Sequence, residues 1–231
     1  AQGIDPTATG TSIDAVAAVV QSEQPDLRPH AAPDGTVTIM FSDIEGSTAM
    51  TERLGDQRWL NLLRGHNAIV RKRVAAHGGF EVKSEGDGFM LAFQSARRAL
   101  QCAIDIQRAF AERNASLPAH PEPVEGRAEP QPSAHASTSS ARAGRSVDAE
   151  PIRIRIGLHT GEAIKEGDDF FGKHVNLAAR VAGQAVGGEV LVSSLLKELT
   201  ESTGEFAFGE GREVELKGLA GPHRLFEVQW Q

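Results

Sequence analysis

The stretch GGFEVKSEGDGFMLAF (residues 78–93) decides the fold, because it holds a helix stop, two short apolar runs and a tight turn. Its paired glycines end a preceding helix. The Asp87-Gly88 dipeptide between apolar runs is a strong signal for a β-hairpin. Residues 80–84 and 89–93 are therefore predicted to form two neighbouring antiparallel strands.

A strand and a long helix precede this hairpin. Residues 36–43 (TVTIMFSD) are β-branched and apolar, as in a buried strand. Residues 47–76 keep the spacing of an amphipathic helix. The positions predicted to face the core are Trp59, Leu62, Leu63, His66, Ile69, Val70 and Val74.

Helix and strand signals continue after the hairpin. Residues 95–113 are predicted to form a helix capped by Ser95, with Cys102 as a core thiol beside its apolar stripe. Residues 152–158 (IRIRIGL) alternate as a half-buried strand does. A turn at Gly161 and a loop around residues 166–169 are expected next. The remaining predicted elements are a helix over 173–185, a strand over 189–192, a short helix over 193–200 and strands within 206–228.

The order of these elements gives the fold class. Strand, helix, strand, strand, helix and strand in succession form a ferredoxin-like βαββαβ core. We therefore expect an α+β protein with one sheet and helices on one face.

Composition and charge restrict the function. The chain has 231 residues, 40% of them hydrophobic, and a formal net charge of -7. This charge argues against a general nucleic-acid binder, but a divalent cation can still bring phosphates to an acidic site. The single cysteine excludes an intrachain disulfide. No apolar run of about 18 residues indicates a transmembrane helix.

Two segments lack the apolar residues of a core. Residues 1–35 are predicted to be a linker with a short helix over 12–21, which is either a plain linker end or the tail of an upstream regulatory helix. Residues 114–150 are predicted to be a disordered insertion inside one catalytic domain that spans 36–231. With no initiating methionine and no signal segment, we expect a fragment of a longer protein.

Two aspartates are the first candidates for a metal site. Asp43 ends the first predicted strand, and Asp87 lies in the hairpin turn before the third. In a βαββαβ sheet the first and third strands are antiparallel neighbours, so these carboxylates converge. Paired carboxylates beside glycines suit hard divalent cations, and two such cations support in-line attack at phosphorus.

Four segments in order resemble the catalytic domain of class III adenylyl and guanylyl cyclases, including the bacterial adenylyl cyclase type. They are FSDIEGST (41–48), EVKSEGDGFM (81–90), IRIGLHTGE (154–162) and DDFFGKHVNLAARV (168–181). The resemblance covers residues 36–228 and implies the class III cyclase fold. The positions of Lys173 and His174 depart from the residues commonest there.

The resemblance implies a role for each candidate residue. Asp43, Asp87 and the carbonyl of Ile44 match the metal ligands. Lys83 and Asp169 match the pair that reads the purine. The matches to the ribose-positioning asparagine, the transition-state arginine and the terminal-phosphate lysine are Asn176, Arg180 and Lys217. Asn176 and Arg180 are four residues apart, so on a helix they share one face.

The resemblance also implies the reaction and its partners. Lys83 and Asp169 form a donor and an acceptor that suit adenine rather than guanine, so ATP is the expected substrate. The expected products are 3′,5′-cyclic AMP and pyrophosphate, with two Mg²⁺ or Mn²⁺ ions per active site. The resemblance further implies a head-to-tail homodimer with shared active sites, a cytoplasmic location and an upstream regulatory domain in a parent that is either free or membrane-attached.

Three other functions are weighed against this one. A cyclase-like module that binds nucleotide without turnover conflicts with the intact set of candidate residues. A diguanylate cyclase would carry a second consecutive acidic residue in the hairpin and no VNLAAR segment. A nucleotide hydrolase would carry a Gly-rich phosphate loop ending in Lys-Ser/Thr, which this chain lacks. His66, His159 and His174 are not at metal-ligand spacing and are expected to have structural or surface roles.

Overall fold

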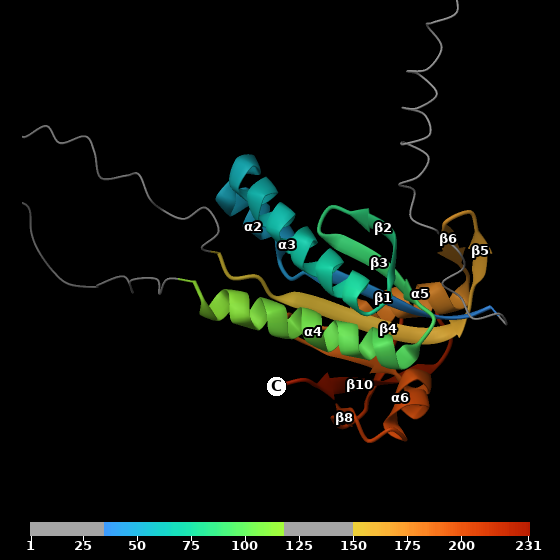
Figure 1. Cartoon of the computed structure of the whole chain (residues 1–231). Helices are drawn as coiled ribbons and strands as arrows, with labels where there is room; N and C mark the ends of the chain where they lie inside the picture. Colours follow the sequence, from blue (N-terminus) through green and yellow to red (C-terminus); the bar gives the residue numbers. More distant parts are fainter. Residues whose placement is uncertain (1–34, 118–149) are drawn as a thin grey trace, which may run out of the picture.

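The computed structural model describes residues 35–117 and 150–231, and within them one mixed eight-stranded sheet forms the centre (Figure 1). Its order is β2-β3-β1-β4-β7-β10-β8, with β9 paired to β10. The strands are β1 (Thr36–Ile44), β2 (Phe80–Glu85), β3 (Gly88–Phe93), β4 (Ile154–Glu162), β7 (Val190–Ser193), β8 (Ala207–Phe208), β9 (Arg212–Glu215) and β10 (Pro222–Gln229). The helices are α2 (Ser47–Leu54), α3 (Asp56–Ala76), α4 (Ala96–Ala115), α5 (Lys173–Ala182) and α6 (Ser194–Glu201).

The first four strands confirm the predicted ferredoxin-like core. Strand β1 lies between β3 and β4 and is antiparallel to both. The β2–β3 hairpin turns where the Asp-Gly signal placed it. Strand β7 then pairs in parallel with β4, as expected for a strand reached through a helix.

Side chains of β1 alternate between the two faces of the sheet. Met40 and Ile44 belong to a large core beneath α3 and α4. Val37 and Ile39 point the other way, into a smaller cluster beneath α5. Alternation along the strand places Asp43 on the α5 side and the side chain of Ile44 on the α4 side.

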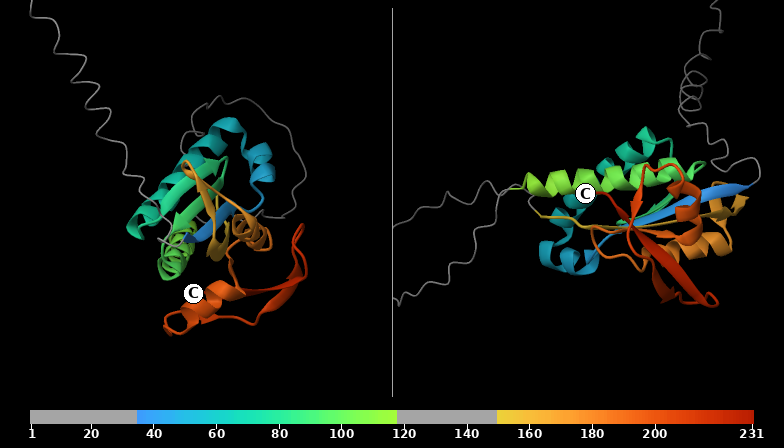
Figure 2. Two further views of the ribbon diagram at one scale, coloured as in Figure 1. Left: turned by 90° about the vertical axis from the view of Figure 1, so that its right-hand side faces the viewer. Right: turned by 90° about the horizontal axis from the view of Figure 1, so that it is seen from below.

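The two faces are covered by different helices (Figure 2). Leu196 of α6 joins the large α3–α4 core. Val175 and Ala178 of α5 lie on the opposite face. The expectation that all helices share one face is therefore corrected. An amphipathic pattern shows that one side of a helix is buried, but it does not show against which face of the sheet.

Three predicted elements differ locally. The helix predicted over 47–76 is interrupted at Gly55, so α2 and α3 are separate helices. Strand β4 continues through Gly161, where a turn was predicted. The loop predicted around 166–169 is a two-stranded hairpin of β5 (Ile164–Glu166) and β6 (Asp169–Phe171).

Helix α4 extends past Asn114, where the insertion was predicted to begin. Helix α4 includes Asn114, whose side-chain amide donates to the carbonyl of Ile152 at 2.7 Å. The amide N–H of Ile152 donates back to Asn114 Oδ1 at 3.0 Å. This pair fixes the chain on both sides of residues 118–149. Those residues, and the linker with its predicted short helix over 12–21, lie outside the described residues.

Helix α5 lies unusually close to the sheet. A Cβ added to Gly157 of β4 would lie 2.1 Å from the backbone nitrogen of Ala182. Only a residue without a side chain fits there, so the Gly157 backbone sets the depth of α5.

Within 35–117 and 150–231, no helix is long and apolar enough to span a membrane.

Candidate active site

The two predicted metal-ligating aspartates converge at the end of β1. Asp87 Oδ2 accepts a hydrogen bond from the backbone N–H of Ile44 at 2.9 Å. This bond holds the β2–β3 turn against the residue that follows Asp43. The carboxylates of Asp43 and Asp87 and the backbone of Ile44 therefore lie at one place, as the sequence predicted.

Arg155, which sequence reasoning missed, binds Asp43 directly. The two residues are paired across β1 and β4. Arg155 Nε and Nη2 donate to the two carboxylate oxygens of Asp43 at 2.6 and 2.8 Å. This hydrogen bond, with the charges of Asp43, Glu45 and Asp87, raises the pKa of the Arg155 guanidinium above its ordinary value. The alternation of IRIRIGL already placed Arg155 on the polar face of its strand. Which residue it would contact could be known only from the β1–β4 register.

The donor chemistry at this place suits a hard divalent cation. The described residues contain no cluster of three or more His, Cys, Asp and Glu side chains arranged to hold a metal. Two carboxylates therefore need a further ligand, and the backbone oxygen of Ile44 is adjacent to Asp43. Oxygen-only ligation of this kind is what Mg²⁺ accepts, with water and phosphate oxygens completing the shell.

Lys83 and Asp169, the predicted purine-reading pair, contact each other. Lys83 Nζ lies 2.7 Å from Asp169 Oδ2. Burial acts to raise the pKa of Asp169, but hydrogen bonds from Lys83 and from the Phe170 N–H hold it below its ordinary value. Lys83 Nζ also lies 6.0 Å from the ring centre of Phe171. Strand β2 and the β5–β6 hairpin thus present one donor and one acceptor together.

A pocket of about 340 Å³ joins the acidic end of β1 to Lys83. Asp43 and Lys83 both line it, and Ala179 and Ala182 of α5 form part of its wall. A carboxylate and an ammonium group therefore face one cavity between the sheet and α5.

Asn176, Arg180 and Lys217 lie outside this pocket. The first two are exposed on the outer side of α5, whose inner side is buried. Lys217 is exposed in the turn between β9 and β10, next to the buried Leu216 that packs against α5. Within the part of the chain that the structure describes, none of these three side chains makes a hydrogen bond or ion pair.

His159 and His174 form a pair that the sequence did not predict. Their rings are stacked with centres 5.1 Å apart, and His159 Nε2 lies 2.8 Å from His174 Nδ1. His159 Nδ1 is 2.7 Å from Ser193 Oγ. Burial, with the neighbouring His174 and His223, lowers the pKa of His159 to about 4. The structural role expected for His159 fits this contact, and His174 has the partner that the sequence did not show.

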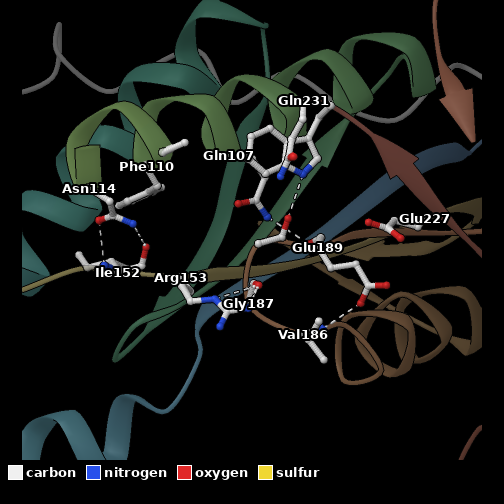
Figure 3. Close-up of a pocket in the computed structure, with 13 residues that line it drawn as sticks. Gln107, Phe110, Asn114, Ile152, Arg153, Val186, Gly187, Glu189, Glu227 and Gln231 are labelled. Carbon is white, nitrogen blue, oxygen red and sulfur yellow. Dashed lines mark hydrogen bonds between the residues drawn. The ribbon is translucent and has the colours of Figure 1, made fainter. Parts of the chain in front are cut away.

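A larger cavity of about 440 Å³ contains none of the predicted site residues (Figure 3). It lies between α4, the turn before β7 and the end of the chain. Gln107 at its wall donates to the carbonyls of Ile154 and Glu189 at 2.8 and 3.1 Å. These bonds tie α4 to β4 and to the residue before β7.

Known proteins match this chain in sequence and structure. The family model "Adenylate and Guanylate cyclase catalytic domain" matches residues 30–229. The chain is 32% identical over 203 residues to an adenylate cyclase of Mycosarcoma maydis, covering 81% of this chain and 8% of the relative. It is 30% identical to a receptor-type adenylate cyclase of Trypanosoma equiperdum, covering 88% of this chain and 46% of the relative.

Solved structures agree with the sequence matches. An adenylate cyclase from Trypanosoma brucei in its monomeric state superposes with a TM-score of 0.65 at 25% identity, covering 89% of this chain and 94% of that one. The chain spans less than half the length of the two curated relatives. With the fold, the family match and the converging site in agreement, this chain belongs to the class III adenylate and guanylate cyclase catalytic domain family.

Proposed function

We propose that this domain is an adenylate cyclase that converts ATP to 3′,5′-cyclic AMP and pyrophosphate. The observation that carries the proposal is the Lys83–Asp169 pair, whose Nζ and Oδ2 atoms lie 2.7 Å apart. Adenine presents an acceptor at N1 and a donor at its 6-amino group, and guanine presents the reverse. Lys83 placed at N1 and Asp169 placed at the 6-amino group would match adenine, whereas guanine would need the donor at position 6 and the acceptor at position 1.

The reaction forms one bond and breaks another at the same phosphorus. The ribose 3′-oxygen attacks the α-phosphorus, the bond to the β-phosphate oxygen breaks, and pyrophosphate leaves with its electron pair. The proton of the 3′-hydroxyl passes to solvent or to the leaving phosphate. The described pocket offers no histidine for this proton, since His66 and His159 are buried elsewhere.

Asp43, Asp87 and the Ile44 carbonyl are the proposed ligands of divalent cations, two per active site. The hydrogen bond from Ile44 N–H to Asp87 orients the second carboxylate toward the first. When bound, Mg²⁺ or Mn²⁺ would lower the pKa of the 3′-hydroxyl and neutralise the triphosphate charge. The protein's part is to hold the two carboxylates together at the end of β1.

Asn176, Arg180 and Lys217 are proposed to act across a dimer. They are exposed and lie outside the pocket that holds Asp43. In a head-to-tail pair, Asn176 would position the ribose and Arg180 would meet the negative charge that develops on the α-phosphate. Lys217 would contact the terminal phosphates. Each active site would take its metal-ligating carboxylates from one subunit and these groups, together with Lys83 and Asp169, from the other. Lys83 and Asp87 of one subunit would therefore serve different active sites.

The activity is tested by incubating the full chain with ATP and, separately, GTP in Mg²⁺ or Mn²⁺, with products identified by mass spectrometry. We expect cyclic AMP from ATP, little cyclic GMP from GTP, and loss of product in Asp43→Ala. Cyclic GMP as the main product would show that Lys83 and Asp169 are wrongly assigned. No cyclic product at high protein concentration would instead favour a nucleotide-binding module.

Shared active sites are tested by mixing two inactive variants. Asp87→Ala lacks a cation ligand and Asn176→Ala lacks the ribose contact, so each homodimer is expected to be inactive. Random exchange of equal amounts gives heterodimers with one intact site, which restores about a quarter of the wild-type activity. No recovery under conditions where subunits demonstrably exchange would contradict the shared-site model.

A further inference from the structure

The contact between Arg155 and Asp43 uses both oxygens that the proposed cation site requires. Arg155 Nε and Nη2 lie 2.6 and 2.8 Å from the two carboxylate oxygens. A planar guanidinium that engages both oxygens is the strong form of this ion pair. The carboxylate is thus matched with a cation from the neighbouring strand.

Arg155 lies beside several carboxylates and not beside Asp43 alone. Asp87 accepts a hydrogen bond from the Ile44 N–H next to Asp43, and Glu45 follows Ile44 in the chain. Glu45 also has Arg153, whose Nη1 lies 3.6 Å from Glu45 Oε2, as a second cation. Asp43 and Asp87 have no such second cation among the described residues.

The Arg155–Asp43 ion pair can open, and Asp43 can bind another cation, without any change in the backbone of the sheet. The β1–β4 register fixes Asp43 opposite Arg155. The side chains are 38% and 33% exposed, so solvent already reaches them. A partly exposed ion pair contributes only on the order of 1 kcal/mol, and a long arginine side chain can rotate while its backbone stays in the ladder.

We propose that Arg155 is a built-in competitor for the divalent-cation site: it neutralises Asp43 in the metal-free protein and gives up at least one carboxylate oxygen when a cation binds. Arg155 therefore sets the cation affinity of the domain. This inference rests on the proposed function, because it takes Asp43 and Asp87 as the cation ligands.

Arg153 supplies the matched control. It lies two residues from Arg155, carries the same charge and has a side chain that is 62% exposed. Its Nη2 donates to the carbonyl of Gly187, and it makes no contact with Asp43. Arg153→Met removes a positive charge from the same region and leaves the Asp43 carboxylate paired.

The test is binding of Mn²⁺ to the full chain without nucleotide, with free Mn²⁺ followed by electron paramagnetic resonance. Arg155→Met is expected to tighten binding about tenfold, because a unit charge near a divalent ion is removed together with the competing bonds. Arg155→Lys keeps the charge but loses the two-oxygen contact, so a smaller gain is expected. Arg153→Met is expected to change the affinity by less than about twofold at this distance.

Different outcomes separate the inference from the function on which it rests. Equal or weaker Mn²⁺ binding in Arg155→Met, with binding still abolished by Asp87→Asn, would overturn the competition and leave the cation site standing. Absence of Mn²⁺ binding in the wild type and in both Arg155 variants would overturn both. If Arg155→Met fails to fold by circular dichroism, Arg155→Lys decides, and unchanged affinity in that variant overturns the inference.

Discussion

The two faces of the central sheet differ in what they bury and in what they present. Beneath α3 and α4 lies one large apolar core that includes Phe93 and Phe110. Beneath α5 the sheet buries smaller clusters, and the pocket with Asp43 and Lys83 opens on this side. The large apolar core and the proposed chemistry therefore lie on opposite sides of the same strands, so substitutions can affect stability and activity separately.

Truncating a large side chain on the α4 face should have the largest effect on stability. Phe110 is 2% exposed, and Phe110→Ala is expected to lower the free energy of unfolding by about 4 kcal/mol. Val175 on the α5 face is 8% exposed, and Val175→Ala should cost about 1.5 kcal/mol. Urea denaturation measures both values. Equal losses would show that the two faces contribute alike.

Acid should weaken the α5 face through His159. The pKa of this buried imidazole is lowered to about 4, while the pKa of a histidine in the unfolded chain is about 6.5. The unfolded state therefore binds the proton first, so stability is full above about pH 7 and falls as the pH drops toward 4.

Between pH 7.5 and 5 the expected loss from His159 is about 2 kcal/mol. The measurement is urea denaturation of the wild type and His159→Gln at both pH values. The variant should lose less stability than the wild type over this interval. Parallel loss in the two proteins would show that His159 does not titrate in this way.

The helices on the two faces also differ in their N-terminal caps, and substitutions at these caps are expected to change stability by smaller amounts. Ser95 Oγ accepts a hydrogen bond from the Arg98 N–H at the start of α4, so Ser95→Ala should cost about 1 kcal/mol. Helix α5 instead begins after Gly172, at φ 122° and without a side-chain cap. Gly172→Ser should destabilise rather than stabilise, by about 1–3 kcal/mol, because L-residues rarely adopt that backbone conformation. A gain in melting temperature would contradict this account.

The smallest stability effects are expected where the largest activity losses are proposed. Asn176 and Arg180 are exposed, so Asn176→Ala and Arg180→Ala should change the free energy of unfolding by no more than about 0.5 kcal/mol. Cyclic AMP formation should fall at least about a hundredfold in each. A loss of stability that accounts for the lost activity would assign these residues to the scaffold.

Local signals predicted most of the scaffold. The Asp-Gly turn, the Ser95 cap and the alternation of residues 152–158 all act through near neighbours, and β3, α4 and β4 form at those places. The side of the sheet taken by α5 depends on how distant elements pack, which periodicity along one helix does not report.

The candidate site also has a part that the sequence predicted and a part that depends on how distant elements pack. Asp43 and Asp87 converge because strand order alone brings them together, and this was predictable from the element order. The contact of Arg155 with Asp43 joins residues 112 positions apart and depends on the exact register of β1 and β4. The stacking of His159 on His174 depends in turn on the depth at which α5 docks.

The depth of α5 couples the positions of two proposed site residues. Because the Gly157 backbone abuts Ala182, any added atom at residue 157 would displace α5 as a rigid body. Asn176 and Arg180 would then move together, so their positions share one degree of freedom. Substitutions elsewhere on α5 can change the chemistry offered to a ligand. The reach of both side chains, however, is set at one position of β4, where the missing side chain lets α5 pack against the strand backbone.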